Sequence, residues 1–487
     1  MATYDPSLYN DDIAPRSGTG HWRTWDLFSW WMSAWHSLGT YTLAIGLLVL
    51  GLTGWGVVGA VAVATVVILV MSNLMGVAGQ RVGVPFPVFA RVSFGVYGAN
   101  LPAILRAVVA VAWYGIQTYL ASTAVMILIE KVWPAASSLT EHGFLGLSTL
   151  GWICFLTLWA AQLAVLWRGM EAVRHISDLA GSAIWVAMLA LMVWMLYRAG
   201  WTVDLSYREV LEPAGGSTFV ALLAAASLVC ANFCGPMLNF GDFTRLAPDT
   251  TSVRRGNLLG LLGNGLAFGL VSIVIALAAV EVHGEAVSDP VHLMADIDSV
   301  AMLLVAIIAV GLATVGINII LNFVSPAYDF ANIAPRYISF RTGGLVTAVL
   351  SLLVMPWKLY ASTTMVHYFL GGIGAMMGPL LGIMLVDYYV VRRGHVVVDD
   401  LYTADPAGAY HYTKGVSLTA VGCFVLASGV ALAAAYAPAL DALADFSWPV
   451  GVAAGALARY AAFLVAGRGP GAEPAPVERD EKVLEAL

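Results

Sequence analysis

The chain has 487 residues, of which 60% are hydrophobic and only 11% are charged, and its formal net charge is −7. Soluble globular chains average about 25% charged residues, so a soluble protein of this composition would lack the polar surface that has to cover its core. The apolar residues recur in runs of roughly twenty, the length of a helix that crosses about 30 Å of hydrocarbon, and this pattern predicts a polytopic membrane protein.

The apolar runs divide the chain into a membrane domain and two polar ends. Residues 1–24 carry Asp11, Asp12 and Arg16 and do not resemble a cleavable signal peptide. Residues 467–487 are rich in proline and charge, which predicts a disordered tail. Between them, residues 25–466 form the predicted transmembrane domain. We expect about twelve helical spans, at residues 25–51, 54–77, 100–129, 147–167, 175–197, 217–241, 257–281, 299–328, 342–356, 360–388, 416–436 and 447–466.

The placement of lysine and arginine predicts the orientation of these spans. With the N-terminus inside, most of the basic residues fall in cytoplasmic segments, whereas the external segments hold only Lys131, Arg198, Arg208 and Lys358. The loop 281–298, which is then external, is acidic. By the positive-inside rule we expect a multi-pass protein of the cell (inner) membrane with both termini in the cytoplasm.

Two of the predicted spans carry interruptions. The first contains a polar stretch that ends near Gly39, and the sixth contains the pair Gly235 and Pro236. Proline removes a backbone donor and kinks a helix. Broken helices five spans apart are typical of an inverted repeat of five plus five helices, in which transporters bind their substrate at mid-membrane. The alternative is that Pro236 only kinks a packed helix.

Polar side chains in the third and eighth spans suggest what the site would bind. Trp113 and Gln117 are four residues apart, as are Asn318 and Asn322, so each pair lies on one helical face. An indole and carboxamides suit a flat heterocycle with amide or ureide groups, because the ring stacks and the amides pair with its N–H and C=O edges. The alternative is that these amides form hydrogen bonds between helices.

Charged residues are not expected at the depth of the helix breaks. Asp242, Asp329 and Arg106 all fall near predicted span ends, and a site without a buried counter-charge favours a neutral solute. Cys230 and Cys234 have helical spacing but no histidine or carboxylate beside them, and we interpret them as packing residues. No metal, cofactor or nucleic acid is expected as a partner, only a small-molecule substrate and the lipid bilayer.

Several motifs in combination resemble the nucleobase:cation symporter-1 family of hydantoin, allantoin, uracil and cytosine permeases. The resemblance covers roughly residues 20–405, and the residues before His36 are most similar to the allantoin-permease branch. The motifs lie at residues 83–88, 90–95, 113–118, 242–245, 322–328 and 378–393.

The resemblance implies a fold and a mechanism. The fold is the LeuT type, in which a bundle of spans one, two, six and seven moves against a scaffold of spans three, four, eight and nine, with two further C-terminal helices. The function is secondary active import by alternating access. Trp113 is expected to stack on the substrate, and Phe233 stands where hydantoin permeases place a second stacking tryptophan. Further substrate-binding and gating positions are expected at Gln117, Asn322, Ser37, Asn318, Phe369 and Leu370.

The same resemblance bears on the coupling ion. Sodium-dependent members bind the ion through carbonyls of spans one and eight and two hydroxyls of span eight, and the matching positions are Ser33, His36, Ala313, Gly316 and Ile317. Gly316 and Ile317 have no hydroxyl, so a hard cation would lack oxygen ligands. We therefore expect sodium coupling to be weak or absent. His36 can titrate near neutral pH and is a candidate proton site, unless it is a neutral imidazole that caps unwound backbone.

Other functions remain as alternatives at this point. A LeuT-type carrier of an amino acid would need a partner for the ammonium group, and a carrier of a betaine osmolyte would need an aromatic box. An intramembrane enzyme is not expected, because the sequence has no zinc-protease motif, nucleotide-binding loop or nucleophile–base pair. The sequence pattern alone does not distinguish a transporter from a channel or a receptor.

Overall fold

The structure is a computed structural model, and it describes residues 4–35, 38–210, 212–284, 293–294, 299–362, 368 and 371–466. Within these residues nine helices are long and apolar enough to cross a membrane, and a bent helix pair at the first span makes ten. Two shorter apolar helices, Thr218–Asn232 and Phe340–Leu353, stand at the sixth and ninth spans. The prediction of an all-α polytopic protein with about twelve spans is therefore confirmed.

The twelve spans follow one another along the chain, and several contain more than one helical segment. In order they are α1 (Thr24–Trp35) with α2 (Leu38–Gly46) and η1 (Leu47–Leu50); α3 (Gly54–Val82); α6 (Asn100–Val132); α7 (Thr149–Trp167); α8 (Met170–Arg198); α9 (Thr218–Asn232) with α10 (Cys234–Leu238); α12 (Thr250–Asn257) with η4 (Leu258–Gly263) and α13 (Asn264–His283); α15 (Val300–Asn318) with η5 (Ile319–Phe323) and α16 (Val324–Ile333); α17 (Phe340–Leu353); α20 (Gly372–Leu385) with η7 (Val386–Val391); α21 (Leu418–Tyr436); and α22 (Ser447–Ala466).

Short elements connect the spans. They are α4 (Phe86–Phe89), α5 (Arg91–Phe94), η2 (Pro134–Thr140), β1 (Gly143–Phe144), β2 (Leu147–Ser148), η3 (Ala214–Gly216), α11 (Gly241–Thr244), α18 (Pro356–Ala361), η8 (Asp399–Tyr402) and η9 (Pro438–Phe446). The two strands form an antiparallel pair in which Gly143 lies opposite Ser148. Local sequence explains several helix ends: Thr53 and Ser148 accept hydrogen bonds from the first helical turn, and α3 ends at Gly83 with a φ of 74° that favours glycine.

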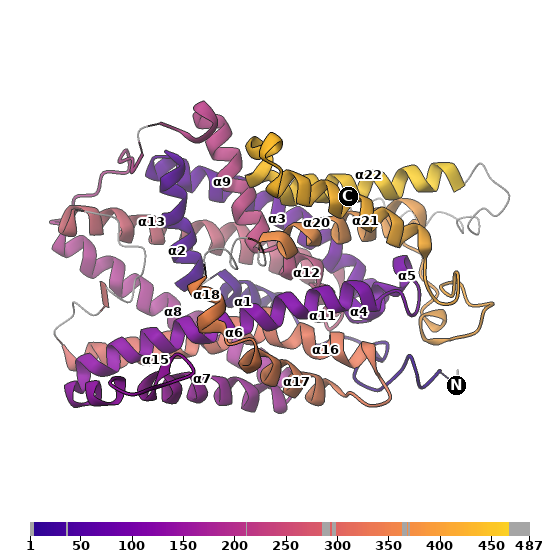
Figure 1. The fold of residues 1–487 in the computed structure, drawn as a ribbon, viewed down its shortest axis with the longest axis horizontal. Helices are drawn as coiled ribbons and strands as arrows, with labels where there is room; N and C mark the ends of the chain where they lie inside the picture. Colours follow the sequence, from indigo (N-terminus) through magenta and orange to yellow (C-terminus); the bar gives the residue numbers. More distant parts are fainter. Residues whose placement is uncertain are drawn as a thin grey trace.

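The long helices run along the longest axis of the molecule (Figure 1). On one side α20, α21 and α22 pack together, and on the opposite side α6 packs against α7, α15 and α16. Between them, α3 packs against α9 and α13, and α1 packs against α8 and α12. These neighbours match the bundle and scaffold that the sequence resemblance implied.

Spans one and six are both discontinuous. In span one the helix axis bends by 56° between Thr24–Trp35 and Thr40–Leu50. His36 and Ser37 lie outside the described residues, and Gly39 belongs to α2. In span six α9 ends before Phe233, which has φ −99° and ψ 10°, and α10 starts at the next residue. Gly235 and Pro236 therefore lie in the first turn of α10, where proline costs no backbone hydrogen bond.

Three spans contain a π-helical turn, which the sequence did not predict. These turns are η4 in span seven, η5 in span eight and η7 in span ten. A π-helical turn places one extra residue in a helix and often occurs at functional sites. The turn in span eight contains Asn322.

Residues 4–23 form an N-terminal strap across one end of the molecule. Asn10 donates hydrogen bonds to the carbonyls of Pro335 and Ile338, at the start of span nine. Arg16 donates to the carbonyls of Arg245 and Ala247, which follow span six, at 2.9 and 2.6 Å. The strap therefore connects a scaffold loop with a bundle loop.

A buried ion pair attaches the last helix to span ten. Arg459 of α22 donates from Nε to Asp387 of η7 at 3.0 Å, and both side chains are almost completely buried. Arg392 and Ser93 contact the other carboxylate oxygen of Asp387, at 3.4 and 3.2 Å. The predicted tail 467–487 lies outside the described residues.

Candidate binding cavity

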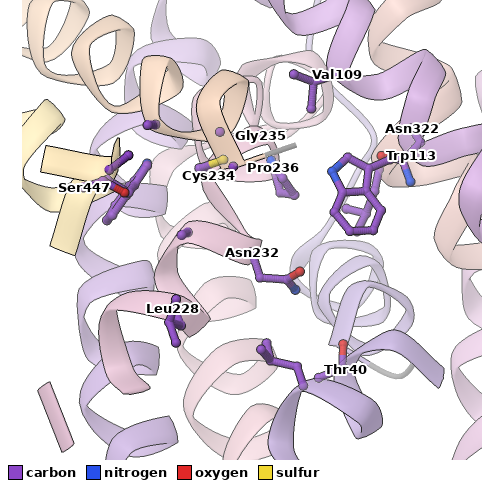
Figure 2. A pocket seen from close by; sticks show the side chains of 18 of the residues that line it. Thr40, Val109, Trp113, Leu228, Asn232, Cys234, Gly235, Pro236, Asn322 and Ser447 are labelled. Carbon is purple, nitrogen blue, oxygen red and sulfur yellow. The ribbon is translucent and has the colours of Figure 1, made fainter. Parts of the chain in front are cut away.

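A cavity of about 500 Å³ lies at the discontinuities of spans one and six (Figure 2). Its walls come from α2, α6, α9, α10, η5 and α20, and it extends to Tyr436 and Ser447 at the adjoining ends of α21 and α22. Cavities of roughly 300–1,000 Å³ are typical of sites that enclose a small molecule.

Trp113 and Gln117 both line this cavity from α6. Their four-residue spacing places them on one face of the helix, and both are half-buried. Among the described residues, neither the indole N–H nor the carboxamide has a hydrogen-bond partner. Both are therefore available to a bound molecule.

Asn322 and Asn318 have different positions although they are one turn apart. Asn322 lines the cavity, and Figure 2 shows it beside the indole of Trp113. Asn318 is completely buried and donates to the carbonyl of Tyr114 and the hydroxyl of Thr118, both at 2.9 Å. It also accepts a hydrogen bond from Asn322 at 3.0 Å. The structure therefore places Asn318 between helices, where it orients Asn322.

Phe233 is not among the described residues that line the cavity. It is 1% exposed, and its ring packs against Trp35 with centroids 4.5 Å apart. The neighbouring Asn232 lines the cavity, and Figure 2 shows its carboxamide directed toward Trp113. The sequence signal that identifies Asn232 is its place directly before the break in span six.

Arg106 also lines the cavity, so the expectation that no fixed charge lies there is wrong. It precedes Trp113 by seven residues, or about two turns of α6. Its guanidinium donates to Asn239 at 3.2 Å and to the carbonyl of Leu321 at 2.5 Å. A Cβ atom at Gly235 would lie 3.2 Å from the guanidinium carbon, so glycine in broken helix six leaves room for this charge.

Asp242 connects three parts of the fold just beyond Arg106. Its carboxylate accepts hydrogen bonds from the backbone N–H of Phe86 at 2.7 Å, from Asn239 at 3.2 Å and from Ser325 at 3.1 Å. These partners come from α4, span six and span eight. These hydrogen bonds hold the loop after span two, the end of span six and span eight together.

The positions that match the sodium ligands of related proteins are tightly packed. Ser33 donates its hydroxyl to the carbonyl of Ser177 at 2.6 Å. Gly316 lies directly against α8, since a Cβ atom there would lie 2.2 Å from the Cβ of Ala180. Ala313 and Ile317 are buried. The described part of the chain contains no group of three or more histidine, cysteine or acidic side chains that could hold a metal ion.

Four of the predicted site residues cannot be placed because they lie outside the described residues. They are His36, Ser37, Phe369 and Leu370. Of the other substrate positions, the structure brings together Trp113, Gln117 and Asn322.

A helical membrane protein with two broken spans around a central cavity has the LeuT-type fold. Solved structures share this fold. The nucleobase-cation-symport-1 transporter Mhp1, closed with bromovinylhydantoin bound, matches with a TM-score of 0.76 at 23% identity, covering 99% of this chain and 100% of that one. A Na⁺-coupled sialic acid symporter matches with a TM-score of 0.64 at 14% identity, covering 94% of this chain and 93% of its own.

Comparison of sequences identifies the family. Residues 17–451 match the model of permeases for cytosine/purines, uracil, thiamine and allantoin, and the chain belongs to this family. The allantoin permease of Bacillus subtilis (strain 168) is 35% identical over 447 residues, which cover 91% of each chain. The purine-uracil permease of Arabidopsis thaliana is 32% identical, over 87% of this chain and 70% of its own. A putative allantoin permease of Escherichia coli (strain K12) is 30% identical, over 93% and 94%. The resemblance noted in the sequence is confirmed.

Proposed function

We propose that this protein is a secondary active transporter that imports a neutral, planar nucleobase or cyclic ureide by alternating access, with allantoin as the first candidate. The observation that carries the proposal is that Trp113, Gln117 and Asn322 line one cavity at the discontinuous helices. Family membership and the two allantoin permeases among the relatives support it.

In the proposed complex the solute lies flat against the indole of Trp113. Gln117 and Asn322 pair with its amide edges, since each carboxamide offers a donor and an acceptor. Because Phe233 packs on Trp35, the opposite wall is formed by Asn232, Gly235 and Pro236. This wall is more polar than a second aromatic ring and suits a solute with several carbonyl groups.

We further propose that transport does not require sodium and is coupled to protons. The contact between Gly316 and Ala180 supports this, because it leaves no space for a hydroxyl-bearing side chain at that position. His36 remains a candidate proton site. In this proposal the protein lies in the cell membrane with both termini in the cytoplasm, as the distribution of basic residues indicates.

Uptake of radiolabelled solutes by cells or proteoliposomes tests the proposal. The panel is allantoin, uracil, cytosine, hydantoin and guanine, each with and without sodium and at two pH values. We expect uptake of at least one solute, independent of sodium and faster at the more acidic external pH. Failure to transport any of them would contradict the substrate class, and stimulation by sodium would contradict the proposed coupling.

A further inference from the structure

A row of buried polar side chains continues along span eight beyond the cavity. Ser325, Asp329 and Asn332 lie at positions i, i+4 and i+7 of α16, on one helical face. All three are buried, and Asp329 is 0% exposed. The row begins one turn after Asn322, which lines the cavity.

Asp329 differs from the other members of this row in its hydrogen bonds. Ser325 donates to Asp242, and Asn332 bonds both Arg91 and Asn100. Within the described part of the chain, neither carboxylate oxygen of Asp329 has a hydrogen-bond partner. Buried polar atoms in proteins are paired in the large majority of cases, and an unpaired buried carboxylate is especially unfavourable.

No charged side chain in the described structure forms an ion pair with the carboxylate of Asp329. Arg106 of α6 and Asp242 of α11 are the charged groups that act on it. Among the described residues neither Arg106 nor any other cation lies within 4.0 Å of its oxygens. The other elements packed on α16, namely α4 and α17, contribute no charged group that acts on it.

Asp242 and Asp329 therefore lie close to one arginine but in different surroundings. Asp242 accepts three hydrogen bonds and is also near Arg245. Asp329 accepts none in the described structure. A carboxylate that receives hydrogen bonds stays ionised, whereas a buried one without donors is stabilised when it takes up a proton.

We propose that Asp329 is a proton-binding residue of this transporter in addition to the candidate His36, a role that rests on the proposed proton-coupled uptake. A hydronium ion from the cavity side gives up its proton: its O–H bond breaks to leave water, and an O–H bond forms on a carboxylate oxygen of Asp329. Asn239 and Asp242 follow the end of span six of the bundle, whereas Ser325 and Asp329 belong to span eight of the scaffold. When these parts separate, the hydrogen bond between Ser325 and Asp242 breaks, Asp329 meets water on the opposite side, and its O–H bond breaks as a water molecule there accepts the proton.

The protonation of Asp329 can be measured without any substrate. Infrared difference spectra of the purified full-length protein, recorded between acidic and alkaline pH with hydrogen–deuterium exchange, report buried protonated carboxyl groups. We expect a protonated carboxyl band at neutral pH that disappears in Asp329→Asn and persists in Asp441→Asn, a matched change at an exposed carboxylate of η9. An unchanged band in Asp329→Asn would overturn the assignment.

Coupling is then measured in proteoliposomes. In Asp329→Asn we expect accumulation driven by a pH gradient to fall to its level without a gradient, while substrate binding and substrate exchange persist. Asp329→Glu, which keeps a titratable group, is expected to restore part of the accumulation. Gradient-driven accumulation equal to wild type in Asp329→Asn would refute the role. If the wild-type protein binds none of the solutes, the proposed function fails, and the infrared result still decides whether Asp329 holds a proton.

Discussion

Carboxamide side chains near the cavity have the same chemistry but different hydrogen bonds. Gln117, Asn232 and Asn322 line the cavity, whereas Asn318 is bonded to Tyr114 and Thr118 between helices. The difference follows from the face of span eight on which each residue lies, since Ile317 lines the cavity while the adjacent Asn318 is bonded to Tyr114 and Thr118 of span three. The two functions considered for such residues, substrate recognition and helix pairing, are therefore divided between adjacent turns of one span.

Gln117→Ala and Asn322→Ala are expected to weaken substrate binding about tenfold each, because a polar group of the bound solute would lose its partner at a cost of about 1–3 kcal/mol. Equilibrium binding of labelled substrate to purified protein measures this. Asn73→Ala is the matched control, since its carboxamide bonds Asn257 away from the cavity. Wild-type affinity in both cavity variants would show that the solute binds elsewhere.

Spacing along a helix indicated faces on which Trp113, Gln117 and Asn322 line the cavity. The same spacing also paired Asn318 with Asn322, although Asn318 is bonded between helices. Spacing did not predict the position of Phe233. A side chain at a helix break can point either to the cavity or to a neighbouring helix, and the ring of Phe233 packs against Trp35. Arg106 was predicted to lie near a span end because a charged residue lowers the local hydropathy in the same way as the end of a span does. Its position depends on the missing side chain of Gly235, a contact between distant parts of the chain.

Packing between α8 and α15 decides whether the positions that match the sodium ligands can hold an ion. At Gly316 the two helices approach so closely that an added Cβ would lie 2.2 Å from that of Ala180. Close approach of this kind requires small residues on both helices. The glycine at position 316 thus has two effects: it provides no hydroxyl ligand, and it allows α8 and α15 to approach closely.

Gly316→Ser is accordingly expected to destabilise the protein by about 1–3 kcal/mol through overpacking, without making uptake sodium-dependent. Adding Ala180→Gly should restore much of the stability by making space for the hydroxyl. Thermal unfolding in detergent and uptake with and without sodium are the measurements. A Gly316→Ser protein as stable as wild type would show that α8 and α15 are not in close contact at this point.

The helical spans were predictable from hydropathy because an apolar segment that crosses the membrane has to hydrogen-bond its own backbone groups, and a helix does so. Their internal irregularities were less predictable. The break in span six lies at Phe233 rather than at Pro236, since proline is accommodated in the first turn of α10. The π-helical turns depend on how neighbouring spans pack, and the residue pattern of one span carries no information on that packing.

The whole molecule is connected at one end by the N-terminal strap, which joins the loop after span six to the start of span nine. At its outer end Tyr4 donates to Asp399 at 2.7 Å, and this hydrogen bond raises the pKa of Tyr4 to about 12. The raised pKa means that the contact is present at neutral pH and is lost only as the pH rises through that value. The strap is thus held at several points along its length, by the loop after span six, the start of span nine and η8.

Arg16→Gln removes the guanidinium that bonds the carbonyls of Arg245 and Ala247. We expect faster amide hydrogen exchange around residues 14–18 and 244–248, because the side-chain bonds of Arg16 to the loop after span six are lost while Asn10 and Asp12 still hold the strap at the start of span nine. Arg168→Gln, at an exposed residue that follows α7, serves as the control. Unchanged exchange in the strap would mean that Arg16 does not hold it.

Attachment of the C-terminal helices depends on the buried pair of Arg459 and Asp387. Arg459→Gln leaves the carboxylate with only the more distant Arg392, and breaking a buried pair typically costs about 3–5 kcal/mol. We expect a lower melting temperature, with partial recovery when Asp387→Asn is added. A melting temperature equal to wild type in the single variant would show that apolar packing alone holds α22 on span ten.

The π-helical turn in span eight separates the direction of the cavity side chains from that of the buried polar row. The turn accommodates one extra residue, so removing one residue from Ile319–Phe323 would convert it to ordinary α-helix and leave the helix before and after it facing as it does now. Ser325, Asp329 and Asn332 would keep their direction, whereas the residues of the turn itself, Asn322 among them, would change theirs. A single-residue deletion in this turn should therefore abolish substrate binding while the protein still folds.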